Sequence, residues 1–166
     1  MTTLVVICHP DPTSFTQAVA AGVLESLAAT GQTTDAWDLY ADGFAASEVA
    51  RLAAARHLVL VYPTWWSGLP AMLKDWLDQL WVPPSPGSRC FPNILSITAI
   101  TSHGSSKWTN LLEGETGRLL LKRGLRRATS PRCRTRWVPF YGIDTAAPDA
   151  RSAFIERAAL AVSHLG

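Results

Sequence analysis

Apolar residues in this chain form short uninterrupted runs, separated by stretches with the spacing of an amphipathic helix. Residues 4–8 and 57–62 are almost wholly apolar and rich in β-branched side chains, which is typical of strands buried on both faces. From this pattern we expect five strands, at residues 4–8, 33–40, 57–62, 94–100 and 135–140.

The intervening segments place apolar residues three or four positions apart, as the core-facing side of a helix requires. The clearest case begins at Leu69, continues through Trp76 to Trp81, and has Pro70 in its first turn, where proline is favoured. The segment VPPSPGSRCFP then ends that helix. The expected helices span residues 14–30, 45–55, 69–81, 115–124 and 148–164.

This alternation of strands and helices predicts one parallel sheet with helices on both faces, because right-handed crossovers place a helix between consecutive parallel strands. We find no internal repeat and no linker, so we expect a single domain over residues 1–166. In such sheets, ligands bind outside the carboxyl ends of the strands. The fold prediction therefore brings three segments to one edge: HPDPTSF, YPTWWSGLP and TSHGSSKW.

The segment YPTWWSGLP sets two adjacent tryptophans, Trp65 and Trp66, in a turn between prolines. Leaving one indole in water forgoes about 5 kcal/mol, from roughly 200 Å² at about 25 cal/mol per Å². Neighbouring residues point in different directions, so one core cannot easily bury both rings. A large flat ligand at the sheet edge, such as a flavin ring, would cover one of them.

The segment HPDPTSF has the features of a phosphate-binding turn. Ser14 fits a helix N-cap with Gln17 three residues later, and the backbone amides beside Thr13, Ser14 and Phe15 would suit a phosphate. Capping alone also explains Ser14, and His9 fits either an anion contact or a bond to a backbone group. The segment matches neither GxGxxG nor a Walker loop, so a Rossmann dehydrogenase and an ordinary nucleotide triphosphatase are not indicated.

The segment TSHGSSKW supplies hydroxyls, the His103 imidazole, and a glycine, Gly104, at which a backbone can approach a planar ligand closely. A plain hydrophilic loop explains the same residues. The fold prediction leaves both interpretations open.

Composition restricts the class of protein. With 48% apolar and 17% charged residues, the chain has the composition of a compact globular protein, and its net charge of +2 indicates little about partners. The first apolar run ends after five residues without a basic flank, which predicts neither a secretory signal nor a membrane span, so we expect a cytoplasmic protein. Three cysteines without CxxC spacing predict free thiols, and we expect no metal site.

Three stretches resemble the flavodoxin-like NAD(P)H quinone dehydrogenase family: HPDPTSF, YPTWWSGLPAMLKDWLDQLW and the late FYGIDTAAPDARSAF. The resemblance spans nearly the whole chain, and the middle stretch is its most specific part. It implies a flavodoxin-like α/β sheet of five parallel strands in the order 2-1-3-4-5, a bound flavin (FMN or FAD), and reduction of quinone-like acceptors by NADH or NADPH. It also implies a homodimer with a shared active site, which would cover the second tryptophan.

The resemblance also assigns site residues. Four match the family's phosphate-binding turn, four match the stretch beside the flavin ring, and four match the loop at the ring's pyrimidine edge, namely His9, Thr13, Ser14 and Phe15; Pro63, Thr64, Trp65 and Trp66; and Thr101, Ser102, His103 and Gly104. Hydride transfer leaves negative charge on the pyrimidine side of the ring, where donors already in place stabilise it best. Amides near His103 and Gly104, or the imidazole itself, are the expected catalytic donors.

Residues 118–136 hold eight of the fifteen Lys and Arg residues and no acid. Three interpretations compete: a solvated basic face, a docking patch for the phosphates of NADPH or another anion, and a nucleic-acid surface. A nucleic-acid groove normally interleaves aromatic side chains for stacking, and this run has none before Trp137, so we do not expect a nucleic-acid partner.

We therefore expect a flavin-dependent NAD(P)H oxidoreductase in which reductant and acceptor use the same face of the ring in turn, a ping-pong scheme. One alternative is a flavin-binding regulatory subunit without significant turnover. The other is an anion-binding or nucleic-acid-binding module that holds no flavin.

Overall fold

The computed structural model describes residues 2–43 and 48–165. The strands are β1 (Thr2–Ile7), β2 (Thr33–Asp38), β3 (His57–Thr64), β4 (Ser96–His103) and β5 (Arg134–Tyr141). The α-helices are α1 (Phe15–Ala29), α2 (Glu48–Ala54), α3 (Ala71–Leu80), α4 (Lys107–Leu112), α5 (Thr116–Leu119) and α6 (Pro148–Val162). The described residues also form three short helical turns: η1 (Leu120–Gly124), η2 (Leu125–Ala128) and η3 (Ile143–Thr145).

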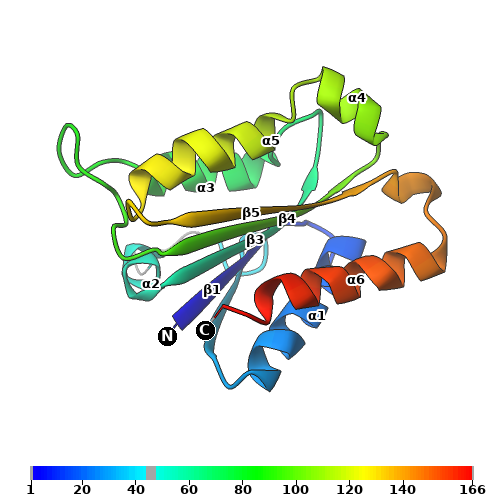
Figure 1. Cartoon of the computed structure of the whole chain (residues 1–166), viewed down its shortest axis with the longest axis horizontal. Helices are drawn as coiled ribbons and strands as arrows, with labels where there is room; N and C mark the ends of the chain where they lie inside the picture. Colours follow the sequence, from blue (N-terminus) through cyan, green and yellow to red (C-terminus); the bar gives the residue numbers. More distant parts are fainter. Residues whose placement is uncertain (1, 44–47, 166) are drawn as a thin grey trace.

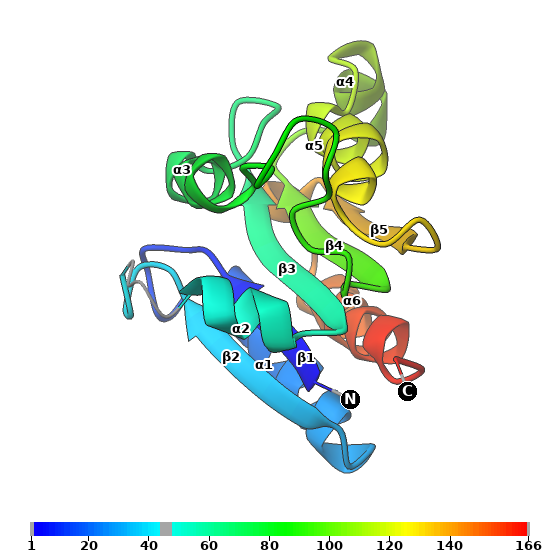
Figure 2. The same ribbon diagram turned by 90° about the vertical axis from the view of Figure 1, so that its left-hand side faces the viewer.

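All five strands are parallel, and their order is β2-β1-β3-β4-β5, as predicted. Helices α1 and α6 cover one face of the sheet, while α2, α3 and the α5 segment cover the other (Figures 1 and 2). The three-layer arrangement confirms the predicted flavodoxin-like α/β fold. None of the helices in the described ranges combines the length and the apolar character that crossing a membrane requires.

Side chains alternate between the two faces of the sheet, and this alternation assembles two cores. Leu4 and Val6 pack with Trp76 on the α3 side, whereas Val5 and Ile7 pack with α1 and α6. The same alternation decides which residues meet at the carboxyl edge. Thr64 pairs in register with His103, and His103 pairs with Tyr141, so strands β3, β4 and β5 set these three residues in one row.

The predicted polar loop over TSHGSSKW was wrong in extent. Strand β4 continues through His103, because Thr101 and His103 are buried despite their polar side chains. A short helix, α4, then begins at Lys107, where the Ser106 side chain caps it by accepting a hydrogen bond from the Thr109 amide. Only residues 104–106 remain as a connection.

Two predicted helices also differ from the structure. For the helix expected at 45–55, residues 44–47 lie outside the described residues, and α2 spans Glu48–Ala54. For the helix expected at 115–124, Glu115 has left-handed backbone angles and precedes the helix, which continues as α5, η1 and η2 to Ala128.

Candidate functional site

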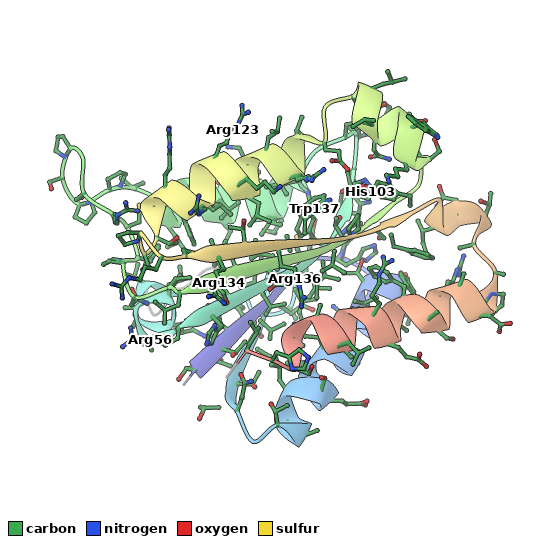
Figure 3. The ribbon with its side chains drawn as sticks, viewed as in Figure 1. Arg56, His103, Arg123, Arg134, Arg136 and Trp137 are labelled. Atoms are coloured by element: carbon green, nitrogen blue, oxygen red, sulfur yellow. The ribbon has the colours of Figure 1, made fainter. Side chains whose placement is uncertain are left out.

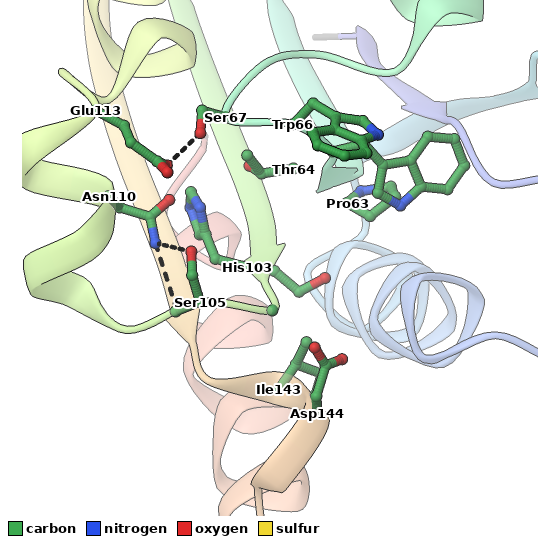
Figure 4. Close-up of a pocket in the computed structure, with 13 residues that line it drawn as sticks. Pro63, Thr64, Trp66, Ser67, His103, Ser105, Asn110, Glu113, Ile143 and Asp144 are labelled. Carbon is green, nitrogen blue, oxygen red and sulfur yellow. Dashed lines mark hydrogen bonds between the residues drawn. The ribbon is translucent and has the colours of Figure 1, made fainter.

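A cleft of about 500 Å³ opens at the carboxyl edge of the sheet, beside the ends of β3 and β4. This volume lies within the range of small-molecule and cofactor sites. Asn110 and Glu113 lie on one side of His103, and Pro63 and Trp66 lie on the other (Figure 4). The lining residues are Pro63, Thr64, Trp65, Trp66, Ser67, Ser102, His103, Gly104, Ser105, Asn110, Glu113, Ile143 and Asp144.

Seven of the predicted cofactor residues line this cleft: Pro63, Thr64, Trp65, Trp66, Ser102, His103 and Gly104. Thr101 does not line it, since its hydroxyl is buried in the sheet and shares a hydrogen bond of 2.8 Å with the Thr64 hydroxyl. The Thr101 hydroxyl therefore helps to fix the side chain of Thr64, which does line the cleft. The predicted phosphate turn lies next to the cleft, because the His9 ring contacts the Trp65 ring edge-on with 5.7 Å between centroids.

The phosphate turn has two amides available for an anion. Within the described residues, the amides of Phe15 and Thr16 have no protein partner, and both lie at the positive end of the 15-residue helix α1. The amide and hydroxyl of Thr13 are already held by the Asp11 carboxylate, at 2.8 and 2.7 Å. These hydrogen bonds lower the pKa of Asp11, which therefore stays ionised in the turn.

Ser14 is the N-cap of α1, as predicted, and its hydroxyl accepts a hydrogen bond from the Gln17 amide at 3.3 Å. The Gln17 side chain does not complete a capping box, because it donates to Asp38 instead. The Phe15 side chain packs against Phe140 and Phe154 in the core. Phe15 can therefore contact an anion only through its backbone.

The tryptophan pair sits in a tight turn closed by two backbone hydrogen bonds between Trp65 and Gly68. Trp66 and Ser67 both have positive φ angles, 49° and 59°. Such turns normally carry glycine or asparagine at these positions, because a left-handed conformation costs other residues about 1–2 kcal/mol. The Trp66 side chain is nevertheless fully exposed, and Trp65 is 39% exposed.

His103 is the most unusual polar side chain in the cleft. The residue is 2% exposed, and within the part of the chain that the structure describes neither ring nitrogen has a partner at hydrogen-bond geometry. Its imidazole stacks on the Tyr141 ring at 4.8 Å and meets the Trp137 ring edge-on at 6.1 Å. Burial lowers the pKa of His103, an effect that Asn110 and the charge of Glu115 partly offset. The resting imidazole is therefore neutral, and both of its nitrogens are buried.

Close to His103 lies a partly buried carboxylate that the sequence analysis missed. Glu115 accepts hydrogen bonds from the Tyr141 hydroxyl and from Arg118, the latter at 2.7 Å, and its side chain is 9% exposed. Its φ of 42° is left-handed, which costs about 1–2 kcal/mol. A helical ion pair at this spacing returns only about 0.2–0.5 kcal/mol. The pair with Arg118 alone does not explain a glutamate here.

Two further carboxylates, Glu113 and Asp144, line the cleft, and no lysine or arginine does among the described residues. Glu113 accepts a hydrogen bond from Ser67 and so ties α4 to the tryptophan turn. Asp144 lies against Gly104, where an added Cβ would come within 2.5 Å of its Oδ2. Glu113 had no sequence signal, whereas Asp144 belongs to the late stretch FYGIDTAAPDARSAF that carries part of the family resemblance.

The basic residues of 118–136 do not gather on one surface. Arg123 projects from the helical segment on one side of the sheet, whereas Arg134 and Arg136 lie on the other side (Figure 3). Two of these side chains donate hydrogen bonds to backbone carbonyls, Arg126 to that of Cys133 and Arg136 to that of Ala161. This division disfavours a single nucleic-acid groove and fits a solvated basic surface.

A parallel sheet in the order 2-1-3-4-5 with a cleft at its carboxyl edge defines the flavodoxin class of α/β proteins. The chain belongs to the family described as Flavodoxin-like fold, whose model matches residues 1–163. No curated protein sequence matches the chain.

Several solved structures share this fold. Smu.1420 from Streptococcus mutans UA159 is 23% identical with a TM-score of 0.87, and the match covers 98% of this chain and 99% of that one. An NAD(P)H:quinone oxidoreductase from Methanothermobacter marburgensis is 22% identical with a TM-score of 0.77, covering 99% and 96%. An FMN-dependent NADH-azoreductase from Bacillus anthracis str. Ames Ancestor, in complex with FMN, is 16% identical with a TM-score of 0.76, covering 99% and 98%.

Proposed function

We propose that this protein is a flavin-dependent NAD(P)H oxidoreductase that reduces quinone-like acceptors by two electrons. The observation that carries the proposal is the cleft at the carboxyl edge of the sheet, which is lined by His103, whose buried ring nitrogens have no hydrogen-bond partner among the described residues. A buried polar group without a partner is costly unless a ligand satisfies it. The similar folds named NAD(P)H:quinone oxidoreductase and FMN-dependent NADH-azoreductase support the same activity.

The residues present fit a flavin. The free amides of Phe15 and Thr16 suit its phosphate, Trp65 offers an exposed ring face beside the cleft, and His103 offers hydrogen-bonding nitrogens. When bound, a flavin would supply the hydride chemistry, accepting two electrons from NADH or NADPH and passing them to the acceptor.

Residues of this chain would hold the flavin in position and stabilise the charge that develops on its ring. A donor that is held in place before the reaction stabilises charge better than water does, because it needs no reorganisation. His103 and the amides near Gly104 are the donors proposed for the pyrimidine edge. Trp66 extends outward beyond the cleft, together with Trp108 and Leu112 on neighbouring α4, all strongly exposed. We propose that a second copy of the chain covers this apolar surface.

The cofactor is tested by the absorbance spectrum of the purified protein and by titration of apoprotein with FMN, FAD and riboflavin. Ser14→Asp keeps a capping oxygen but places a charge at the proposed phosphate site. It should weaken FMN binding at least about tenfold, since a hydrogen bond to a charged group is worth about 1.5–3 kcal/mol. Riboflavin affinity should not change, because riboflavin lacks the phosphate.

Ser106→Asp is a matched control, because Ser106 caps α4 with the same geometry and does not line the cleft. It should leave FMN affinity unchanged. Consumption of NADH or NADPH with a quinone acceptor, with parallel initial-rate plots, would support the enzyme. Flavin binding without turnover would instead establish the regulatory alternative, and an apoprotein that binds no flavin would overturn the proposal.

A further inference from the structure

We propose that Glu115 is a positioning residue for His103: it fixes the Tyr141 ring on which the imidazole stacks, and its charge favours the protonated imidazole. The part of this inference that concerns hydride transfer rests on the proposed function. The part that concerns His103 itself does not, because it can be measured without a cofactor.

The contacts form a continuous path from Arg118 to the cleft. Arg118 holds one carboxylate oxygen of Glu115, and the Tyr141 hydroxyl donates to the other oxygen. The Tyr141 ring then supports the imidazole of His103 at an interplanar angle of 26°. A tyrosine that is fixed at its hydroxyl cannot swing away from the ring stacked on it.

The side chain of Glu115 does not cap the helix that follows it. Glu115 is the N-cap of α5, yet its side chain makes no capping hydrogen bond and turns to Tyr141 and Arg118 instead. Its left-handed backbone is a conformation that glycine adopts more readily. Strain of this kind at a site edge persists where the side chain has a specific task.

Burial opposes ionisation of Glu115, but hydrogen bonds from Tyr141 and Arg118 outweigh that effect and lower its pKa. Glu115 therefore carries its charge throughout the neutral range. The polar and charged groups around His103 come from every neighbouring element, namely Thr64 on β3, Trp137 and Tyr141 on β5, Asn110 and Glu113 at α4, Glu115 and Arg118 at α5, and Asp144 on η3.

The test is an NMR titration of the His103 imidazole in the flavin-free protein. Glu115→Gln can still accept from Tyr141 but has no charge, so the imidazolium loses a favourable partner. We expect the pKa of His103 to fall by on the order of half a unit, less than the 1–3 units of a direct ion pair. Glu113→Gln is the matched control, since it removes the same charge from an exposed neighbour and should produce a smaller change.

A second variant separates positioning from structural support. Glu115→Gly suits the left-handed backbone, so the fold should be retained, while the pKa of His103 falls and its signals broaden as Tyr141 loses its anchor. In the flavin-loaded protein, the pH profile of flavin reduction should move with the His103 pKa. Equal shifts in Glu115→Gln and Glu113→Gln, or no shift in either, would overturn the inference whether or not the protein proves to bind flavin.

Discussion

At the scale of single residues, Trp66 combines features that folding alone does not explain. Its backbone is left-handed and its indole is fully exposed, so the residue carries strain and gains no burial. Asparagine or glycine would satisfy the turn better. Trp66 also lines the cleft, and its turn is tied to the end of α4 by the hydrogen bond from Ser67 to Glu113. We therefore expect Trp66 to contact a ligand or a second subunit.

The substitution Trp66→Asn tests this conclusion, because asparagine tolerates the left-handed region. We expect the free energy of unfolding, measured with urea, to rise by about 1 kcal/mol. Flavin affinity or self-association, measured by titration and by size-exclusion chromatography, should fall. Trp108→Asn is the control for stability alone, since Trp108 is exposed in the right-handed helix α4 and its replacement relieves no such strain.

Two outcomes would contradict this view of Trp66. A loss of stability in Trp66→Asn would show that the indole packs in the folded monomer. A gain in stability with unchanged flavin affinity and unchanged elution volume would remove both proposed contacts of the ring.

At the scale of elements, the sequence predicted what burial controls and missed what local polar contacts control. The strands at 57–62 and 94–100 are apolar on both faces, so their pattern located β3 and β4 to within a few residues. Helix α4 escaped prediction because it has six residues and depends on the Ser106 cap. A helix this short has no periodicity to detect.

The candidate site divides in the same way. The segments that hold Pro63 to Trp66 and Ser102 to Gly104 were predicted because buried parallel strands lead into them, and the family resemblance then assigned these residues. Glu115 was missed, because its importance comes from a left-handed backbone and from contact with Tyr141, 26 residues away. Contacts of this kind follow from the strand register, which a single sequence does not reveal.

The packing of α1 against α6 depends on one glycine. A Cβ on Gly22 would lie 2.6 Å from Cγ2 of Ile155. Alanine would improve the helix propensity by about 1 kcal/mol, but overpacking costs about 1–3 kcal/mol. We therefore expect Gly22→Ala to destabilise the protein in a urea denaturation experiment.

A double-mutant cycle tests whether Ile155 causes this loss of stability. In an Ile155→Ala background the obstructing methyl is absent, so Gly22→Ala should become stabilising by about 1 kcal/mol. An equal effect of Gly22→Ala in both backgrounds would show that Ile155 does not set the distance between the helices.

At the scale of the whole molecule, buried titratable groups make stability depend on pH in both directions. His57 and His103 are buried, and burial lowers the pKa of each, with the N-terminal charge adding to the effect at His57. Below about pH 6.5 the unfolded chain binds protons at both histidines that the folded chain does not. Stability should therefore fall with decreasing pH, by at most about 1.4 kcal/mol per pH unit for each histidine. His57→Asn should reduce this slope, which urea midpoints taken across pH 5 to 7 would measure.

The alkaline side depends first on Cys8. Burial raises the pKa of its thiol to about 12 from an ordinary value of 9.0, so between these values unfolding releases a proton and stability falls as pH rises. Burial also raises the pKa of Tyr62 and of Tyr141, to about 12 for Tyr141, and both add to the loss above pH 10.0. Burial also raises the pKa of Cys90 and of Cys133 from 9.0, so these thiols contribute in the same range. Cys8→Ala should therefore make the onset of alkaline destabilisation shallower near pH 9 in urea midpoints taken across pH 7 to 11. An unchanged onset would mean that the Cys8 thiol ionises as readily in the folded protein as in the unfolded chain.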